Sequence, residues 1–394
     1  MRFARRPLLV ASASAVLGAL ATSGCKKKEE VDSGKAASHA TGEIVVGHYA
    51  SMTGGTAHFG QDTDKAVRLA IEQANAAGGV NGRKLRVVTL DTRGDSAEAA
   101  NAVSRLIDVE KASAILGEVA SSLSLAGGRV AQRQKIPMVS PSSTNPKVTE
   151  VGDYIFRVCF LDPFQGRVMA NFAYDNLKFK TAAILRDIKN DYSIGLADAF
   201  KAAFTAKGGR VVTDVSYSQG DTDFSAQLTT IKSHKVAIEA LFVPGYYSEV
   251  GAIARTAQRL GLKTPLLGGD GWDAPDLFKI GGDALNGSYF SNHFAPDVAA
   301  PRAQKFVADF KTKYGQEPTG LGALGYDAAA VLVDAMKRAA SVEAKALRDA
   351  LAQTRNFEGV SGKITIDAQR NAQKSAVVLK IEDGKAKFEA TVAP

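Results

Sequence analysis

The chain has 394 residues, 45% of them hydrophobic, which is enough to bury more than one sizeable core. Its formal net charge is +8, yet the arginines and lysines are scattered among acidic residues. No basic stretch carries interleaved aromatic side chains, so nucleic acid is not expected as a partner.

The N-terminus reads MRFARRPLLVASASAVLGALATSGC, with three arginines ahead of an apolar stretch from Leu8 to Ala21. That stretch is short for a transmembrane helix, and small residues lead directly to Cys25, as at a lipoprotein cleavage site. Residues 1–24 are therefore predicted to be a lipoprotein signal peptide and Cys25 the lipidated residue. The alternative is an ordinary secretory signal with an incidental cysteine. Either reading places the mature chain in the periplasm or at the cell surface, and a lipid at Cys25 would be its only membrane attachment.

Residues 25–42 are polar, rich in small side chains and free of apolar periodicity, which predicts a flexible tether. Beyond Cys25 the only cysteine is Cys159, so no internal disulfide is expected although the compartment is oxidising. Cys159 alternates with apolar neighbours, and we expect a buried strand thiol without chemistry.

Strand and helix patterns alternate along the rest of the chain. Short apolar runs bounded by turn residues predict buried parallel strands, and apolar residues at helical spacing predict the helices between them. The expected strands are 43–50, 84–90, 112–118, 136–141, 179–187 and 210–218, with a further strand and loop in 237–249; the expected helices are 62–79, 96–112, 195–209 and 224–234.

The two halves of this pattern share one order of glycine pair, strand, Gly-Asp, helix, buried strand and polar loop. This order predicts two lobes of the same α/β plan. The loops GEVASS (117–122) and PGYYSE (244–249) end corresponding strands, where open α/β sheets bind their ligands. A small-molecule site between the lobes follows from this placement.

The serines of LGEVASSLSL (116–125) raise the question of catalysis. No histidine stands near them in the sequence, and no G-x-S-x-G turn presents them. The histidines lack metal-ligand spacing, and no glycine-rich phosphate loop is present. Neither an enzyme nor a metal or cofactor is expected. Ser121 or Ser122 would instead cap the following helix, whose N-terminus suits a carboxylate.

The opening of the body, IVVGHYASMTGGTAHFGQDTDKAVRLAIEQANAAGGVNGRKLRVVTLDTRGD, resembles the periplasmic branched-chain amino-acid (Leu/Ile/Val) binding proteins of ABC transporters. The similarity continues through PMVSPSSTNP, DPFQGRVMA, NDYSIGLADAF and GGDGWDAPDL and covers essentially all of residues 43–394. The positions that match the family's opening pattern are Gly47, Gly54, Asn75, Gly78, Gly79, Val80, Gly82 and Asp91.

The resemblance implies the type I periplasmic binding fold, with two Rossmann-like parallel-sheet lobes joined by three crossing segments near residues 161, 290 and 373. Lobe 1 would comprise residues 43–161 and 291–373. Lobe 2 would comprise residues 162–290 and the final strands in 374–394.

The family's binding residues carry over by position. Ser121 would hold the ligand carboxylate, Thr144 both the carboxylate and the ammonium, and Asp270 the ammonium. The Ser142 carbonyl would also accept from the ammonium. Tyr192 and Tyr246 would close over the head of the amino acid, with Phe59 against its side chain. Trp272, the only tryptophan, follows Asp270 by two residues and is expected near the same side chain for that reason. Taken singly, Asp270 could equally be a turn acid between glycines, and the tyrosines could be packing residues.

The resemblance also implies a function. A monomeric receptor would bind an α-amino acid, most simply leucine, isoleucine or valine, and deliver it to the permease subunits of an ABC importer. An amino-acid or amide sensor of the same fold without a transport role is the alternative, and a serine hydrolase is a remote third.

Overall fold

Two separate sheets organise the part of the chain that the structure describes, residues 42–297 and 299–393 of a computed structural model. Every helix in this part is too short or too polar to span a bilayer. The predicted signal peptide, the tether up to residue 41 and the lipidated Cys25 lie outside the described residues.

The first sheet has the strand order β2-β1-β3-β4-β5, and all of its pairs are parallel. Strands β1, β3 and β4 are buried, as the continuous apolar runs predict, whereas the edge strand β2 is largely half-buried and exposes Arg86, so its expected burial is wrong. The strands are β1 (Ile44–Ala50), β2 (Leu85–Asp91), β3 (Ala114–Leu116), β4 (Met138–Ser140) and β5 (Ile155–Arg157). The helices between them are α1 (Ala57–Ala76), α2 (Ser96–Asp108), α3 (Ser121–Gln134) and α4 (Lys147–Glu150).

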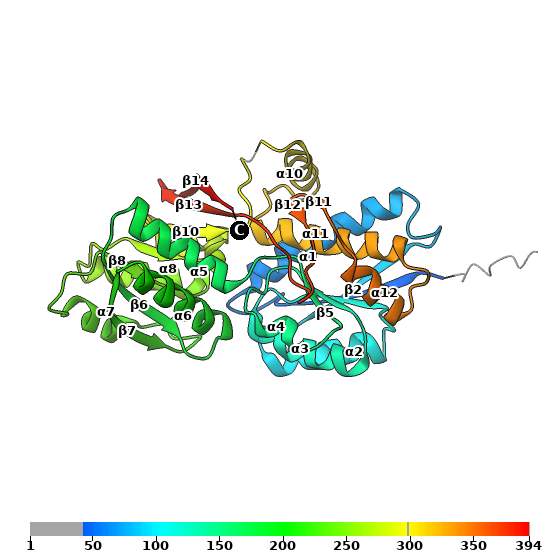
Figure 1. Cartoon of the computed structure of the whole chain (residues 1–394), viewed down its shortest axis with the longest axis horizontal. Coiled ribbons are helices and arrows are strands. Elements are labelled where there is room, and N and C mark those ends of the chain that lie inside the picture. The colour runs from blue at the N-terminus through cyan, green and yellow to red at the C-terminus, as the bar shows by residue number, and fades with distance from the viewer. Residues whose placement is uncertain (1–41, 298, 394) are drawn as a thin grey trace, which may run out of the picture. The chain divides into compact units, whose positions relative to one another are not determined.

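A later part of the chain returns to this lobe. Helix α11 packs along α1, and its apolar face shares a core with β1 and β3 (Figure 1). The returning elements are α10 (Pro301–Tyr314), α11 (Gly320–Arg338), α12 (Ala344–Ala352), β11 (Phe357–Gly359) and β12 (Gly362–Ile364).

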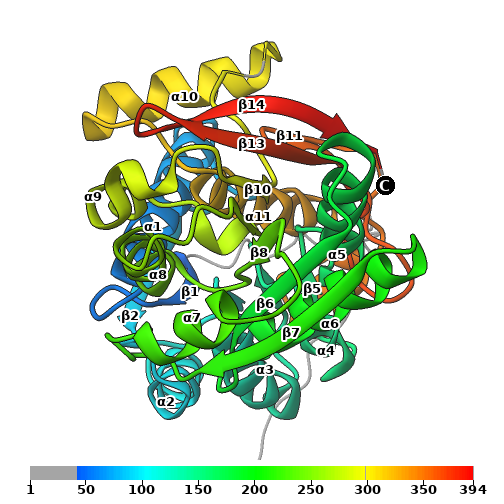
Figure 2. The ribbon, with the colours of Figure 1, turned by 90° about the vertical axis from the view of Figure 1, so that its left-hand side faces the viewer.

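The second sheet has the order β14-β13-β10-β9-β8-β6-β7. Its strands from β7 to β10 are parallel, whereas the hairpin β13–β14 joins β10 antiparallel and forms the edge of the sheet (Figure 2). The lobe is thus a Rossmann-like parallel sheet with an antiparallel edge. The strands are β6 (Thr181–Asp187), β7 (Arg210–Tyr217), β8 (Ala240–Phe242), β9 (Leu266–Gly268), β10 (Tyr289–Asn292), β13 (Ala376–Glu382) and β14 (Lys385–Val392).

The helices of this lobe connect its strands. They are α5 (Asp162–Asn171) with a π turn η1 (Phe172–Asn176), α6 (Asp191–Ala206), α7 (Ser225–Lys232), α8 (Tyr247–Arg259), the 3₁₀ turn η2 (Asp270–Trp272), α9 (Pro275–Gly281) and the 3₁₀ turn η3 (Gly282–Leu285).

Some expected boundaries are wrong. The helix expected at 62–79 begins at Ala57, because Thr56 and the residues before it already turn into the helix. In the segment 237–249 the strand shrinks to β8, since Pro244 and Gly245 follow it and α8 begins at Tyr247.

The chain passes from the first sheet to the second between β5 and α5, returns after β10, and passes over again before β13. The residue limits given above for the lobes remain predictions. Cys159 lies in the first of these passages, just after β5, and so is not a strand residue. It is buried as expected, and burial raises the pKa of its thiol to about 12, which makes it unreactive.

Candidate functional site

The candidate site gathers at the carboxyl ends of strands from both sheets. Ser121 follows β3, Thr144 follows β4, Tyr246 follows β8 and Asp270 follows β9. All four side chains are buried. The parallel arrangement brings their loops to one edge of each sheet, which is where α/β folds place ligands.

The loop that begins helix α3 differs from the expected capping arrangement. The cap position is Ala120, and neither Ser121 nor Ser122 caps the helix with its side chain, so that expectation is wrong. The Ala120 N–H instead donates to the buried carboxylate of Glu118, at 2.7 Å. Ser121 Oγ accepts a hydrogen bond from the backbone of Asn145, at 3.3 Å, which ties the serine loop to the loop after β4.

The loop after β4 is held from beneath by Arg157, which is fully buried at the end of β5. Its guanidinium donates to the carbonyl of Ser143, to that of Asn145 at 2.8 Å and to that of Pro146 at 3.2 Å. A planar, forked donor suits several carbonyls at once. Arg157 therefore fixes the backbone on which Ser142 and Thr144 stand.

Aromatic side chains form another wall of the site. The rings of Tyr192 and Tyr246 are stacked with their centroids 5.4 Å apart, and Phe59 from the first lobe meets Tyr246 edge-to-face at 5.4 Å. Tyr192 Oη accepts from the backbone N–H of Gly271, at 3.1 Å, beside Asp270. Burial raises the pKa of both tyrosines well above 10, so both are neutral phenols.

Asp270 is held by two neutral side chains. Gln165 Nε2 lies 2.8 Å from Asp270 Oδ1, and His293 Nε2 lies 2.9 Å from Asp270 Oδ2. Burial lowers the pKa of His293, so the imidazole is neutral and donates through its Nε2–H. Neither partner brings a positive charge, and each carboxylate oxygen keeps a further lone pair for a cation.

A second carboxylate, that of Asp162, lies nearby at the start of helix α5. It is fully buried, and neither of its oxygens has a hydrogen-bond partner among the described residues. Burial raises the pKa of Asp162 well above its ordinary value; the nearby Thr144 hydroxyl and the Arg157 guanidinium oppose this shift, and the neighbouring Asp270 adds to it. The backbone N–H of Asp162 donates to the Thr144 carbonyl, at 3.0 Å, so this acid adjoins the loop after β4.

Sequence reasoning missed Asp162, Gln165 and His293 as site residues. A weak signal for the first two existed, since they stand three residues apart directly after the predicted crossing segment, and that spacing places both side chains on one face of the helix. His293 had no such signal, because its role depends on β10 lying next to β9.

Hydroxyls in the same region also lack protein partners. Within the described residues, Ser142 Oγ and Thr144 Oγ1 are buried and unbonded, as is the amide oxygen of Gln165. Buried polar groups in folded proteins are nearly always hydrogen-bonded. A concentration of unbonded donors and acceptors therefore marks this place as one that receives a polar molecule.

The comparisons with known proteins agree with this architecture. A family model described as periplasmic binding protein matches residues 43–386. The chain belongs to this family.

Several relatives of this periplasmic binding protein are named after the amino acids leucine, isoleucine and valine. It is 32% identical to Leu/Ile/Val-binding protein homolog 3 of Brucella melitensis, over 89% of this chain and 94% of the relative. Among solved structures it resembles a leucine binding protein LivK from Thermotoga maritima, with 45% identity, a TM-score of 0.85, and coverage of 89% of this chain and 99% of that chain. It also resembles LivJ from Streptococcus pneumoniae, solved in complex with isoleucine, with 33% identity, a TM-score of 0.83 and coverage of 89% and 99%.

Trp272 occupies a different environment from the one expected in this periplasmic binding protein. Its indole N–H donates to the Val243 carbonyl, at 3.0 Å, and its ring packs on Phe290 of β10 and over Gly268. These contacts explain Trp272 as part of the core of the second lobe. Trp272 is therefore not part of the proposed ligand site.

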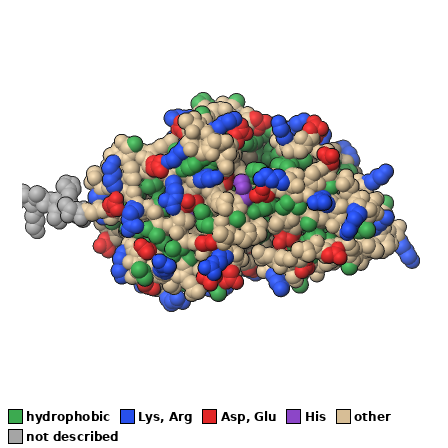
Figure 3. All heavy atoms as spheres, turned by 180° about the vertical axis from the view of Figure 1, so that it is seen from behind, with side chains coloured by type: hydrophobic (Ala, Val, Ile, Leu, Met, Phe, Trp, Pro, Cys, Tyr) green, Lys and Arg blue, Asp and Glu red, His purple; other side chains and the backbone are tan. Residues whose placement is uncertain are grey.

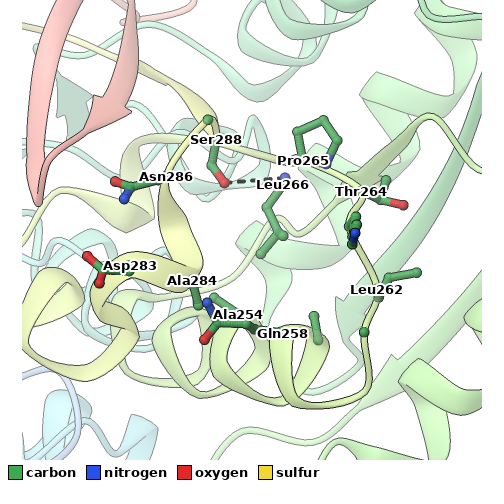
Figure 4. Close-up of a pocket in the computed structure, with 14 residues that line it drawn as sticks. Ala254, Gln258, Leu262, Thr264, Pro265, Leu266, Asp283, Ala284, Asn286 and Ser288 are labelled. Atoms are coloured by element: carbon green, nitrogen blue, oxygen red, sulfur yellow. Dashed lines mark hydrogen bonds between the residues drawn. The ribbon is translucent and has the colours of Figure 1, made fainter.

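A hollow of about 490 Å³ lies elsewhere in the second lobe of the binding protein (Figure 4). Leu266 and Ser288 line it, and the Leu266 N–H donates to Ser288 Oγ at 3.3 Å. Both residues stand at the amino ends of β9 and β10, opposite to the end that carries Asp270. This position makes the hollow a poor candidate for the ligand of an α/β lobe.

Neither a metal site nor a binding surface for a polyanion is indicated in the part of the chain that the structure describes. In residues 42–297 and 299–393, no group of three His, Cys, Asp or Glu side chains is placed to hold a metal ion. The face in Figure 3 carries Lys and Arg side chains interspersed with Asp and Glu rather than a block of one sign.

Proposed function

We propose that this protein captures an α-amino acid with an aliphatic side chain between its two lobes and delivers it to the permease subunits of an ABC importer. The observation that carries the proposal is the set of buried, unbonded polar groups of Ser142, Thr144 and Asp162 beside Asp270. The names of the relatives support leucine, isoleucine or valine as the ligand.

The donors and acceptors divide into two sets that match a zwitterion. On one side, Ser121 and Thr144 offer hydroxyls, and the first N–H groups of helix α3 carry the positive end of its dipole. These groups suit the ligand carboxylate. On the other side, Asp162 and Asp270 offer carboxylate oxygens for the ammonium. A zwitterion leaves water only if both of its charges are paired in this way.

Asp162 and Asp270 would share the ammonium unequally. Asp270 is already oriented by Gln165 and His293, so it is a preformed acceptor. Asp162 has both oxygens unbonded and gains the most when a cation arrives. Together they make the ammonium end acidic enough to exclude ligands without a positive charge.

Charge-assisted hydrogen bonds contribute roughly 1.5–3 kcal/mol each. Four or five of them, after the cost of ordering the ligand and closing the lobes, are compatible with about −8 kcal/mol, or micromolar affinity.

The side-chain end of the site is apolar on one side. Phe59 and Tyr246 present rings that suit an aliphatic chain. Ser142 adds a hydroxyl to the same region, and its unbonded Oγ would also tolerate a small polar side chain.

Calorimetry of the mature chain against all twenty amino acids tests the proposal. We expect the tightest binding from leucine, isoleucine or valine. Two analogues of leucine are the controls: isoamylamine, which lacks the carboxylate, and isocaproate, which lacks the ammonium. Each should bind at least a hundredfold more weakly, because it leaves one set of buried groups unpaired. Failure of every amino acid to bind would refute the proposed function.

The location belongs to the same proposal. An exported receptor held at the membrane by a lipid on Cys25 would work as a monomer beside its permease. Export without attachment after Cys25→Ala, with the wild type found in the membrane fraction, is the expected result.

A further inference from the structure

Helix α6 of the second lobe begins at Asp191, and this residue reaches the first lobe through four of its own atoms. Its backbone N–H, its backbone carbonyl and both carboxylate oxygens are each paired with a group from residues 122–147. Ser122 lies in the first turn of helix α3, Lys147 is the first residue of α4, and Asn145 lies in the loop just before α4.

The contact with Ser122 is reciprocal. Ser122 Oγ donates to Asp191 Oδ2, at 3.0 Å, and accepts from the Asp191 backbone N–H, also at 3.0 Å. The Ser122 hydroxyl therefore both donates a hydrogen bond to Asp191 and accepts one from it, across the two lobes. This arrangement fixes both the separation and the direction of the two loops.

Asn145 and Lys147 complete the contact. Asn145 Nδ2 donates to the Asp191 carbonyl, at 2.7 Å, and the Lys147 ammonium lies 3.7 Å from Asp191 Oδ1. Asn145 also donates its backbone N–H to Ser121, a residue of the candidate ligand site. The contact is thus joined directly to the carboxylate end of that site.

The next residue along α6 is Tyr192, which lines the same site from the second lobe. One turn contains both the contact to the first lobe and the aromatic ring over the ligand. The turn also passes very close to the first lobe at Gly195, where an added Cβ would lie 2.7 Å from Asn145 Nδ2 of that lobe; Asp162 Oδ2, on α5 of the second lobe, would lie 3.2 Å away.

We propose that Asp191, with Ser122, Asn145 and Lys147, is a latch that holds the two lobes closed over the amino acid and sets its rate of release. The inference rests on the proposed function, since it assigns the latch to the ligand between the lobes. In an open arrangement Asp191 and its partners are all solvated, so the latch exists only in the closed form, which the ligand-free protein samples in equilibrium with the open form. It positions Tyr192 and does not itself touch the ligand.

Release of radiolabelled leucine by the mature chain measures the latch. Asp191→Ala and Ser122→Ala should each speed dissociation by about tenfold, because the first removes one hydrogen bond and the ion pair to Lys147, and the second removes two hydrogen bonds, all between the closed lobes. Association should be unchanged, since the ligand enters the open form. The matched control is Asp198→Ala on the same helix, because Asp198 pairs only with Arg186 within the second lobe.

Gly195→Ala provides a test that does not depend on removing a bond. Alanine favours the helical conformation, so the second lobe should fold at least as stably as in the wild type. The added methyl meets Asn145 only when the lobes are closed, whereas its contact with Asp162 lies within the second lobe and is present in either state. We expect leucine affinity to fall by more than tenfold while the thermal midpoint of the ligand-free protein stays the same or rises.

Wild-type rates of leucine release in both Asp191→Ala and Ser122→Ala would overturn the latch, as would full affinity in Gly195→Ala. Its failure is distinguishable from failure of the proposed function, which would show as no amino-acid binding by the wild type. In that case X-ray scattering of the ligand-free proteins decides. A larger radius of gyration for Asp191→Ala than for the wild type supports the latch, and equal radii overturn it.

Discussion

Asp270 and Thr144 are the residues proposed to bind the two charged groups of the ligand. Asp270 would pair with the ammonium, and the unbonded hydroxyl of Thr144 would donate to the carboxylate. Asp270→Ala and Thr144→Ala are each expected to weaken leucine binding by at least tenfold, since each loses a charge-assisted hydrogen bond. Calorimetry measures the change. Thr229→Ala, on the exposed face of α7, is the control for loss of a threonine hydroxyl and should bind as the wild type does.

Asp162 makes ligand capture dependent on pH. Burial raises the pKa of this carboxyl, so the ligand-free protein holds a proton on it over a window above the ordinary value of about 4. An incoming ammonium favours the charged form and drives the proton off. Within this window, binding should therefore release a proton and affinity should rise with pH, then level off once the ligand-free protein has lost that proton.

Proton release is measured by calorimetry in two buffers that differ in ionisation enthalpy. The wild type should give different apparent enthalpies in the two buffers. Asp162→Asn, which cannot lose a proton, should give nearly equal ones. Buffer-dependent enthalpies of the same size in both proteins would assign the proton to another group.

At the scale of elements, the loop after β4 depends on one side chain. Arg157 supplies the donors for the carbonyls of Ser143, Asn145 and Pro146 from a fully buried position. Arg157→Ala would remove these three hydrogen bonds and the side chain that fills the buried space beside the loop, at a cost of about 3 kcal/mol or more in the free energy of unfolding. Urea unfolding measures this loss.

Two variants calibrate the Arg157 result. Arg157→Lys keeps the charge but cannot fork to several carbonyls, so its loss of stability should be smaller than that of alanine yet still clear. Arg133→Ala, at the exposed end of α3, should change stability by less than about 0.5 kcal/mol. A loss for Arg157→Ala as small as that for Arg133→Ala would show that the loop does not need the guanidinium.

The elements were more predictable than the site. Buried strands such as β1 and β3 are predicted by their continuous apolar residues, and α2 by its apolar face. The boundaries failed where Pro244 and Gly245 cut a strand short, or where the turn at Thr56 extended a helix. Family resemblance supplied Thr144 and Asp270 because these residues follow strands in matching segments.

Other site features could not be read from the chain. His293 approaches Asp270 only because β10 pairs with β9, and Asp191 meets Ser122 only because two loops 69 residues apart face each other. Trp272, in contrast, was expected at the ligand site but does not line it. Nearness to Asp270 in sequence suggested the ligand site, whereas a 3₁₀ turn points its ring into the lobe core.

At the scale of the whole molecule, the proposed ligand contacts both lobes and should couple their unfolding. The three passages of the chain connect the lobes in every state and the latch connects them in the closed form, but the unpaired acids at the site favour the open form until a cation arrives. Leucine at about a hundred times its dissociation constant should stabilise the folded protein by about 2.7 kcal/mol. Calorimetric unfolding should show the thermal transition moving upward as a single peak.

The same experiment on Tyr246→Ala separates coupling of the lobes from simple binding to one of them. This variant keeps the first lobe's hydroxyls but loses the ring that meets Phe59 and Tyr192. If binding needs both lobes, leucine at the same concentration should raise the midpoint of unfolding far less in the variant than in the wild type. If the first lobe alone holds the ligand, its transition should shift as much as in the wild type while the second lobe unfolds separately at an unchanged temperature. That pattern would contradict a site shared between the lobes.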